Sequence, residues 1–194
     1  MRIRSKWQSG KATLEDNASA LAYIIWQISL EQTKNLHRED YIYDDDHQRT
    51  GVLAEYLCFL VHLSDRLTIG SLSFQQRGEF MQTLAKGTAR HLQRNLEDVY
   101  GRNQDYRIDY VNQLNERIAE YSGYGFSEQE PGYSMLRSLG RHIQDLMGEG
   151  QTNRWIIDQV MEIDSKTAIA ELKKGLDNLF GSATSLGLSR APEI

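Results

Sequence analysis

The sequence contains little cysteine and little proline. Its one cysteine, Cys58, has no second cysteine for an internal disulfide or for a Cys-x-x-Cys metal or redox centre. A chain without disulfides suits a reducing compartment, so we expect a cytoplasmic protein. The only two prolines are Pro131 and Pro192, so the strongest helix breaker is absent from the first 130 residues. Long helices are therefore expected in that part of the chain.

The sequence also lacks a hydrophobic run that could cross a membrane. Its most apolar windows, 18–30 and 52–63, are shorter than the roughly 18–20 residues of a membrane-spanning helix. The basic start is not followed by the apolar stretch of a signal peptide. The formal net charge is −5 and is spread along the chain, which argues against a large nucleic-acid-binding surface. We therefore expect neither a membrane nor a nucleic acid as partner.

Strand signals are missing too, because valine is scarce and no segment alternates apolar and polar residues between turns. Apolar residues instead recur every three or four positions, which predicts an all-α fold. We expect a single domain, 1–194, of about six helices in a helical bundle or compact α-array, with a basic N-terminal arm (1–12) and a frayed C-terminal tail (182–194). The predicted helices cover 14–36, 48–69, 74–100, 105–121, 134–147 and, after a cap at Thr152, the chain to 180.

Local signals refine these boundaries. Asp46 and Ser73 are the expected N-caps of the second and third helices, and Gly101 is expected to end the third. Gly78 and Gly87 lie inside that third helix, where each glycine costs about 1 kcal/mol relative to alanine. Close packing against a neighbouring helix would compensate for this cost.

Two other helices have patterns that can be tested. The fourth is expected to bury one stripe, and the last is expected to risk a break near Gly175. The stripe consists of Ile108, Val111, Leu114 and Ile118.

The second helix is the most informative segment. Residues 57–63 are apolar except at His62, so this helix is expected at the centre of the fold. Glu55, His62 and Arg66 fall on nearly one line along it, with Asp65 beside them. We call these four residues the polar stripe. They form either a metal, acid–base or ligand site, or an internal network of hydrogen bonds and ion pairs that fixes helix register. In both cases we expect His62 to be buried and hydrogen-bonded to a carboxylate.

Metal binding has a weaker signal. The pattern His-x-x-Asp occurs three times and puts both groups on adjacent helical turns, which suits a shared divalent metal or a plain side-chain pair. The three pairs are His37/Asp40, His62/Asp65 and His142/Asp145, of which His62 and Asp65 are the candidate metal ligands. The run Asp44–His47 is interpreted as capping the following helix rather than as a cation site. Glu-x-x-His, P-loop and Gly-x-Ser-x-Gly motifs are absent, which removes support for di-iron, nucleotide-binding and serine-hydrolase functions.

The connection 121–133 is rich in glycine and aromatic residues. Its aromatic residues are Tyr121, Tyr124, Phe126 and Tyr133. They form either a ligand lid or partner-binding surface, or a loop folded down on the helices.

Two functions remain in view. Motifs that carry chemistry are missing while amphipathic helix surface is plentiful, which favours a non-enzymatic helical domain that binds another protein or itself. The alternative is a helical-bundle enzyme or metal-binding protein centred on Glu55, His62, Asp65 and Arg66, with a divalent metal as its cofactor.

Overall fold

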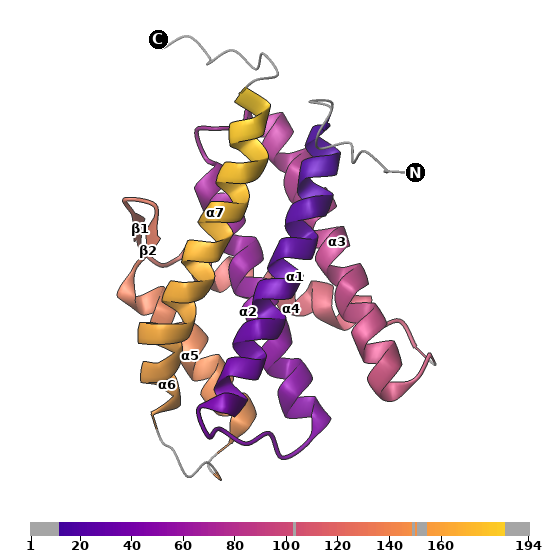
Figure 1. The fold of residues 1–194 in the computed structure, drawn as a ribbon, viewed down its shortest axis with the longest axis vertical. Helices are drawn as coiled ribbons and strands as arrows, with labels where there is room; N and C mark the ends of the chain where they lie inside the picture. The colour runs from indigo at the N-terminus through magenta and orange to yellow at the C-terminus, as the bar shows by residue number, and fades with distance from the viewer. Residues whose placement is uncertain (1–11, 103, 149, 151–154, 185–194) are drawn as a thin grey trace, which may run out of the picture.

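The computed structural model describes residues 12–102, 104–148, 150 and 155–184, and most of them are helical (Figure 1). The prediction of an all-α fold of six packed helices is confirmed. A short hairpin between the fourth and fifth helices is the one departure from the expectation of no sheet in this part. The elements are α1 (Leu14–Arg38), α2 (Asp46–Thr68), α3 (Phe74–Tyr100), α4 (Arg107–Ser122), β1 (Phe126–Ser127), β2 (Glu130–Pro131), α5 (Tyr133–Met147), α6 (Ile156–Gln159), a π-helical segment (Val160–Asp164) and α7 (Ser165–Thr184).

Several predicted segments lie mostly outside the described residues. This applies to the N-terminal arm apart from residue 12, to the cap at Thr152 and to residues 185–194 of the tail. Residues 182–184 of the predicted tail still belong to α7. No helix in the described ranges is both long and apolar enough to span a membrane.

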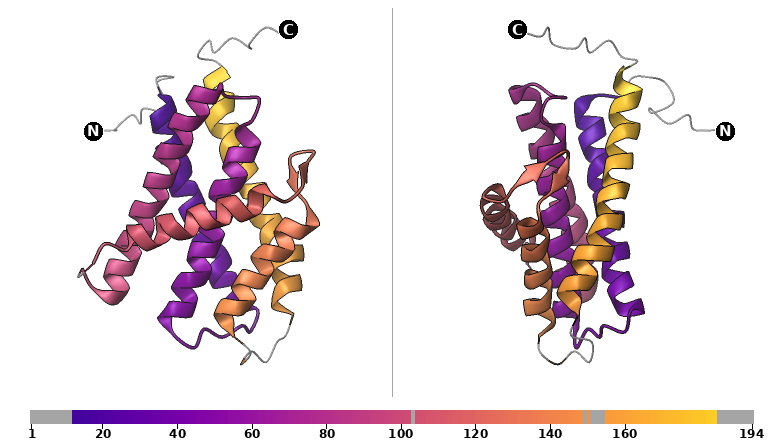
Figure 2. Two further views of the ribbon diagram at one scale, coloured as in Figure 1. Left: turned by 180° about the vertical axis from the view of Figure 1, so that it is seen from behind. Right: turned by 90° about the vertical axis from the view of Figure 1, so that its left-hand side faces the viewer.

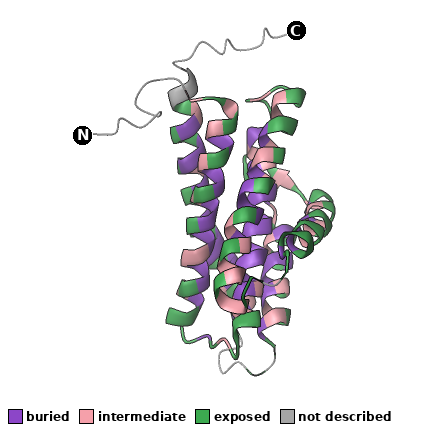
Figure 3. Ribbon diagram, turned by 90° about the vertical axis from the view of Figure 1, so that its right-hand side faces the viewer, coloured by how far each residue is buried: buried purple, intermediate pink, exposed green. Residues whose placement is uncertain are grey.

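α2 lies at the centre of the molecule. Every residue from 52 to 64 is buried, and the helix packs against α1, α3, α4, α5 and α7. In the side view, α1 and α7 lie on one side of α2 and α4 crosses it on the other (Figure 2). Buried residues follow the sides on which the long helices face one another, and exposed residues cover the outer surface (Figure 3). The central position follows from the sequence, because a helix that is apolar nearly all round must be surrounded.

α1 and α3 run in the same direction, opposite to α2, and approach each other closely (Figure 1). A Cβ atom added to Gly87 would lie 2.5 Å from the Cβ of Ala22, so only glycine fits there. One turn further along both helices, the ring of Trp26 stacks on His91 at 5.9 Å. The compensation expected for the helix-interior glycines is thus confirmed for Gly87, whereas Gly78 has open space beside it.

The helix ends largely follow their signals. Ser73 caps α3, and Gly101 ends it with a φ of +93° that favours glycine. The predicted cap of α2 is wrong by one residue, because the side chain of Asp45, not Asp46, accepts a hydrogen bond from the Gln48 amide at 2.9 Å.

The last helix does not break at Gly175. This glycine instead lets α7 pack against Ile24 of α1, because an added Cβ would lie 3.2 Å from that side chain. The irregularity lies earlier, in the π-helical segment Val160–Asp164. There the helix takes an additional residue in one turn, as is typical of π-helical segments.

The π-helical segment turns Asp164 into the interior. Its carboxylate accepts hydrogen bonds from the Tyr56 hydroxyl at 3.0 Å and from the Gln159 amide at 3.1 Å. Burial raises the pKa of Asp164. The preceding residue, Ile163, is 55% exposed.

α4 buries only half of the stripe predicted for it, because Leu114 is buried and Ile118 packs partly buried against the core. Ile108 is 62% exposed and Val111 is 40% exposed, whereas Tyr110, Leu114 and Tyr121 are buried. The reason is that α4 crosses α2 and α3 on one outer side, so it rests on a narrow face that its tyrosines supply (Figure 2). Periodicity alone cannot distinguish a buried tyrosine face from an isoleucine and valine face beside it.

Candidate functional site

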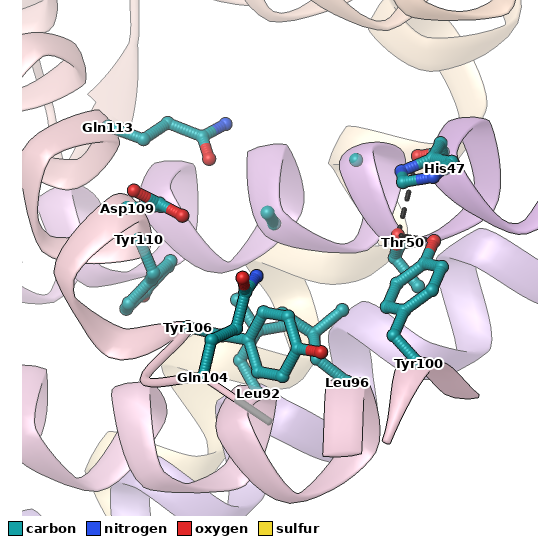
Figure 4. A pocket seen from close by; sticks show the side chains of 12 residues that line it. His47, Thr50, Leu92, Leu96, Tyr100, Gln104, Tyr106, Asp109, Tyr110 and Gln113 are labelled. Atoms are coloured by element: carbon teal, nitrogen blue, oxygen red, sulfur yellow. Dashed lines mark hydrogen bonds between the residues drawn. The ribbon is translucent and has the colours of Figure 1, made fainter. Parts of the chain in front are cut away.

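A pocket of about 520 Å³ opens between α2, α3 and α4 (Figure 4). This volume lies within the roughly 300–1,000 Å³ that is usual for ligand sites. Small residues of α2 and leucines of α3 supply the apolar lining, and polar groups come from α4 and from the connection before it. The lining residues are His47, Thr50, Gly51, Ala54, Leu92, Leu96, Tyr100, Gln104, Tyr106, Asp109, Tyr110 and Gln113.

Three tyrosines give the pocket an aromatic character. The hydroxyl of each has a hydrogen-bond partner within the fold, and Tyr106 and Tyr110 are buried. Tyr100 shares a hydrogen bond with Thr50 at 3.1 Å, Tyr106 donates to the Gly101 carbonyl at 3.0 Å, and Tyr110 donates to the Thr88 hydroxyl at 3.1 Å. The imidazole of His47 stacks on Tyr100 with ring centroids 4.8 Å apart.

The charged side chains in the described lining of the pocket are of one sign. Asp109 lines the pocket, and neither lysine nor arginine is among its described lining residues. Asp109 is exposed and makes no ion pair or hydrogen bond within the described ranges. The nearby Arg107 is engaged elsewhere, because its guanidinium pairs with Asp105 at 2.6 Å. The pocket thus combines one acid, aromatic rings and amides.

A buried ion pair supports the α4 side of the pocket. Glu55 of α2 is 2% exposed and accepts hydrogen bonds from Arg117 of α4 at 2.7 and 2.8 Å. Gln113, which lines the pocket, donates its amide N–H to the same carboxylate at 2.8 Å. The hydrogen bonds with Glu55 raise the pKa of Arg117, so the guanidinium stays charged. This first member of the polar stripe therefore fixes α4 on α2 beside the pocket.

His62 is buried as predicted, with 2% of its surface exposed, but the carboxylate partner was predicted wrongly. Asp65 pairs instead with Arg77 of α3 at 2.9 Å, and Glu55 is taken by the ion pair just described. Within the described ranges, Nε2 of His62 has no hydrogen-bond partner. Burial, together with the charge of Arg66, lowers the pKa of His62 to about 4, so its ring is neutral near pH 7.

The aromatic connection lies against the polar stripe. The Tyr121 ring packs 5.6 Å from the His62 ring, and the Arg66 guanidinium lies 5.2 Å from the centre of the Phe126 ring. Tyr124 donates a hydrogen bond to Glu120 at 3.2 Å, whereas Tyr133 is exposed. The connection is therefore folded down on the helices by three of its four aromatic residues, and its hairpin covers the end of the stripe.

The described residues contain no group of three or more histidine, cysteine, aspartate or glutamate side chains arranged to hold a metal. The predicted His-x-x-Asp pairs have other contacts, since His142 bonds with Glu120 at 2.8 Å and His37 lies 3.4 Å from the Tyr41 carbonyl. The run Asp44–His47 was interpreted as a helix cap, and Asp45 does cap α2. Asp46 pairs with Arg49 at 2.7 Å.

One polar cluster was missed from the sequence. Glu120 of α4 accepts a hydrogen bond from Ser138 of α5 and lies 2.8 Å from Nε2 of His142. Burial would raise the pKa of Glu120, but hydrogen bonds from Ser138 and His142 outweigh it and lower the pKa. Nε2 of His142 also lies 3.3 Å from the Ser138 hydroxyl, so the three side chains are in mutual contact. We interpret the cluster as a clamp between α4 and α5, two helices whose contact no spacing rule predicts.

Comparisons with known proteins give a limited similarity. The chain is 25% identical over 147 residues to a probable DNA polymerase, YorL, of Bacillus subtilis strain 168. It is equally similar over the same length to a DNA-directed DNA polymerase of Bacillus phage SPbeta. The match covers 73% of this chain but spans only 10% of the length of either polymerase. No protein family matches the sequence, and no solved structure matches the fold.

Proposed function

We propose that this chain is a non-enzymatic interaction domain that holds a side chain of a partner protein in the pocket between α2, α3 and α4. The observation that carries the proposal is the pocket itself, which has leucines and tyrosines in its lining, polar groups from α4, and tyrosine hydroxyls that are already bonded. Protein interfaces concentrate their binding energy where an anchor side chain enters a pocket of this kind. The rim of polar residues would surround that anchor.

Binding fits the lining better than catalysis does. The hydroxyl of Thr50 is bonded to the Tyr100 hydroxyl and to the Asp46 carbonyl, so no activated nucleophile faces the pocket from that position. The alternative of a metal-binding protein or bundle enzyme has less support. Its two carboxylates, Glu55 and Asp65, are each paired with an arginine of another helix.

The similarity to the polymerases favours a larger protein as partner. In them the similar segment is a tenth of the chain and is therefore joined to much more protein. By analogy, we propose that this chain works in contact with a larger protein, and a DNA polymerase is the partner class that the similarity suggests. The cytoplasm is the proposed compartment, because it suits the free thiol of the buried Cys58.

The proposal can be tested with capped tripeptides Gly-X-Gly, in which X is in turn aliphatic, aromatic, neutral polar, anionic or cationic. Each is titrated into the ¹⁵N-labelled chain, and the amide resonances of Gly51, Gln104 and Asp109 are followed. We expect at least one class to shift them in a saturable way. An Ala54→Leu variant should abolish the shifts by filling the pocket, while Ala119→Leu, on the exposed side of α4, should not. If no class shifts the pocket resonances, the proposed function is wrong.

The pocket of a helical interaction domain could instead bind a second copy of the same chain. Sedimentation analysis at increasing concentration separates the two cases. We expect the mass of one chain throughout. If the chain forms a dimer and the Ala54→Leu variant does not, the pocket binds a second copy of the chain instead of a partner protein.

A further inference from the structure

We infer that the outer side of α3 binds an acidic helix of a partner protein through a row of three cations, Lys86, Arg90 and Arg94. We call these three residues the basic row. None of them lines the pocket between α2, α3 and α4, so the inference concerns a second surface and goes beyond the proposed function.

The basic row lies on one side of α3. Its members are four residues apart, so each is one turn from the next, and all three are exposed. None of them forms an ion pair within the described ranges. Nε of Arg90 donates a hydrogen bond only to the Lys86 carbonyl, at 3.2 Å. Like charges at this spacing destabilise a helix, and a bound anion would remove that cost.

The side of α1 that borders the basic row does not neutralise it. α1 runs beside α3 (Figure 1), and there the ring of the exposed Tyr23 lies 5.9 Å from the His91 ring. Burial, followed by the charges of Arg94 and Arg90, lowers the pKa of His91, so this ring is neutral near pH 7. The cations therefore face solvent beside uncharged rings.

Acidic side chains lie at the two ends of the basic row. Glu15 and Glu79 share a surface hollow with its first two cations but form no ion pair with them, and Asp98 follows its last cation by one turn. The positive surface is therefore short, about 12 Å along the helix axis. A long polyanion that reaches past both ends would meet these acids and the net charge of −5. A short acidic segment fits better than a nucleic acid.

The spacing of the basic row favours a helix as that segment. Four residues advance an α-helix by about 6 Å, so a helix lying along α3 with carboxylates four residues apart can pair one with each cation. The phosphates of a DNA strand follow one another about every 3.4 Å along the axis and do not match the cations one to one. Each arginine can hold a carboxylate through two parallel hydrogen bonds.

The test uses a fluorescent, alanine-based helical peptide of about 18 residues with glutamate at every fourth position. We expect it to bind, to shift the amide resonances of the basic row and to bind more weakly as salt is added. The same peptide with glutamine for glutamate should bind roughly tenfold more weakly. Arg90→Gln should weaken binding of the glutamate peptide about threefold, the size expected of one exposed ion pair. The control Arg141→Gln, at an exposed arginine of α5, should leave it unchanged.

Three results would overturn the inference: equal binding of the glutamine peptide, equal binding of an isomer of matched helix content with its glutamates in one block, or equal effects of Arg90→Gln and Arg141→Gln. Tighter binding of a DNA duplex that Arg90→Gln weakens would assign the basic row to nucleic acid instead. Ala54→Leu, which fills the pocket, should not change binding of the glutamate peptide. The proposed function can therefore fail its own test while this inference stands, and the reverse.

Discussion

Arg117 of α4 and Glu55 of α2 form two hydrogen bonds, at 2.7 and 2.8 Å, across the junction of the crossing helix with the central one. The carboxylate is almost fully buried, so water cannot replace either bond. The pair thus decides how α4 is held beside the pocket.

Removing the arginine should therefore be costly. In Arg117→Met the Glu55 charge stays buried without its partner, and we expect the free energy of unfolding to fall by about 3–5 kcal/mol. The control is Arg102→Met, because Arg102 is exposed and lies 3.9 Å from Glu97, a surface pair worth at most about 1 kcal/mol. Urea denaturation measures both variants. Equal losses would mean that the Glu55 pair contributes no more than a surface pair.

His62 should make stability depend on pH. Its pKa is about 4 in the folded chain and near 6.5 when unfolded, so between these values the unfolded chain binds the extra proton. The contribution is fully present above about pH 6.5 and is lost as the pH falls toward 4, by at most about 1.4 kcal/mol per pH unit. His62→Leu should remove this slope at little cost near pH 7, because no described partner of Nε2 is stranded. His47→Asn, at an exposed histidine, should keep the slope; its loss there would contradict the assignment.

Two buried tyrosines should respond differently to loss of the hydroxyl. The Tyr56 hydroxyl donates to the buried Asp164, so Tyr56→Phe should lower the free energy of unfolding by about 1–3 kcal/mol. The Tyr121 hydroxyl has no partner among the described residues, so Tyr121→Phe should be neutral or stabilising. Thermal or urea denaturation of this matched pair gives the comparison. A loss as large for Tyr121→Phe would point to an unseen hydrogen bond at that hydroxyl.

The two glycines inside α3 should also behave oppositely. Gly87→Ala brings a methyl group to 2.5 Å from Ala22, and the resulting separation of α1 from α3 should cost about 1–3 kcal/mol. Gly78→Ala meets nothing within 4 Å and should stabilise the helix by up to about 1 kcal/mol. Urea denaturation of the two variants is the measurement. If Gly87→Ala is as stable as Gly78→Ala, the close contact of the helices is not required.

Much of the fold follows from local patterns. The bounds of α3, its Ser73 cap and the burial of α2 depend on neighbours within a few turns, which the sequence displays directly. The buried side of α4 could be predicted only in part, since Leu114 is buried but Ile108 is exposed. It is set by Glu55, which lies 62 residues before Arg117 and draws that polar residue inward.

The candidate site was predicted in part. The burial of His62 follows from its apolar neighbours, but the partners of the two carboxylates depend on which helices face them. Arg77 reaches Asp65 from α3, and Arg117 reaches Glu55 from α4. The pocket itself arises only where three helices meet, so no run of the sequence marks it.

The π-helical segment Val160–Asp164 has a consequence for how this chain can change in length. One residue inserted into a regular α-helix rotates everything after it by about 100° and would turn a buried face to solvent. A π-helical turn absorbs such a residue locally, so Ile156 before it and Leu172 after it are both buried. One residue of this turn, such as the exposed Ile163, can therefore be deleted, or one inserted, with the change in helical register confined to the turn. The helices on either side, α6 and α7, would keep their buried faces.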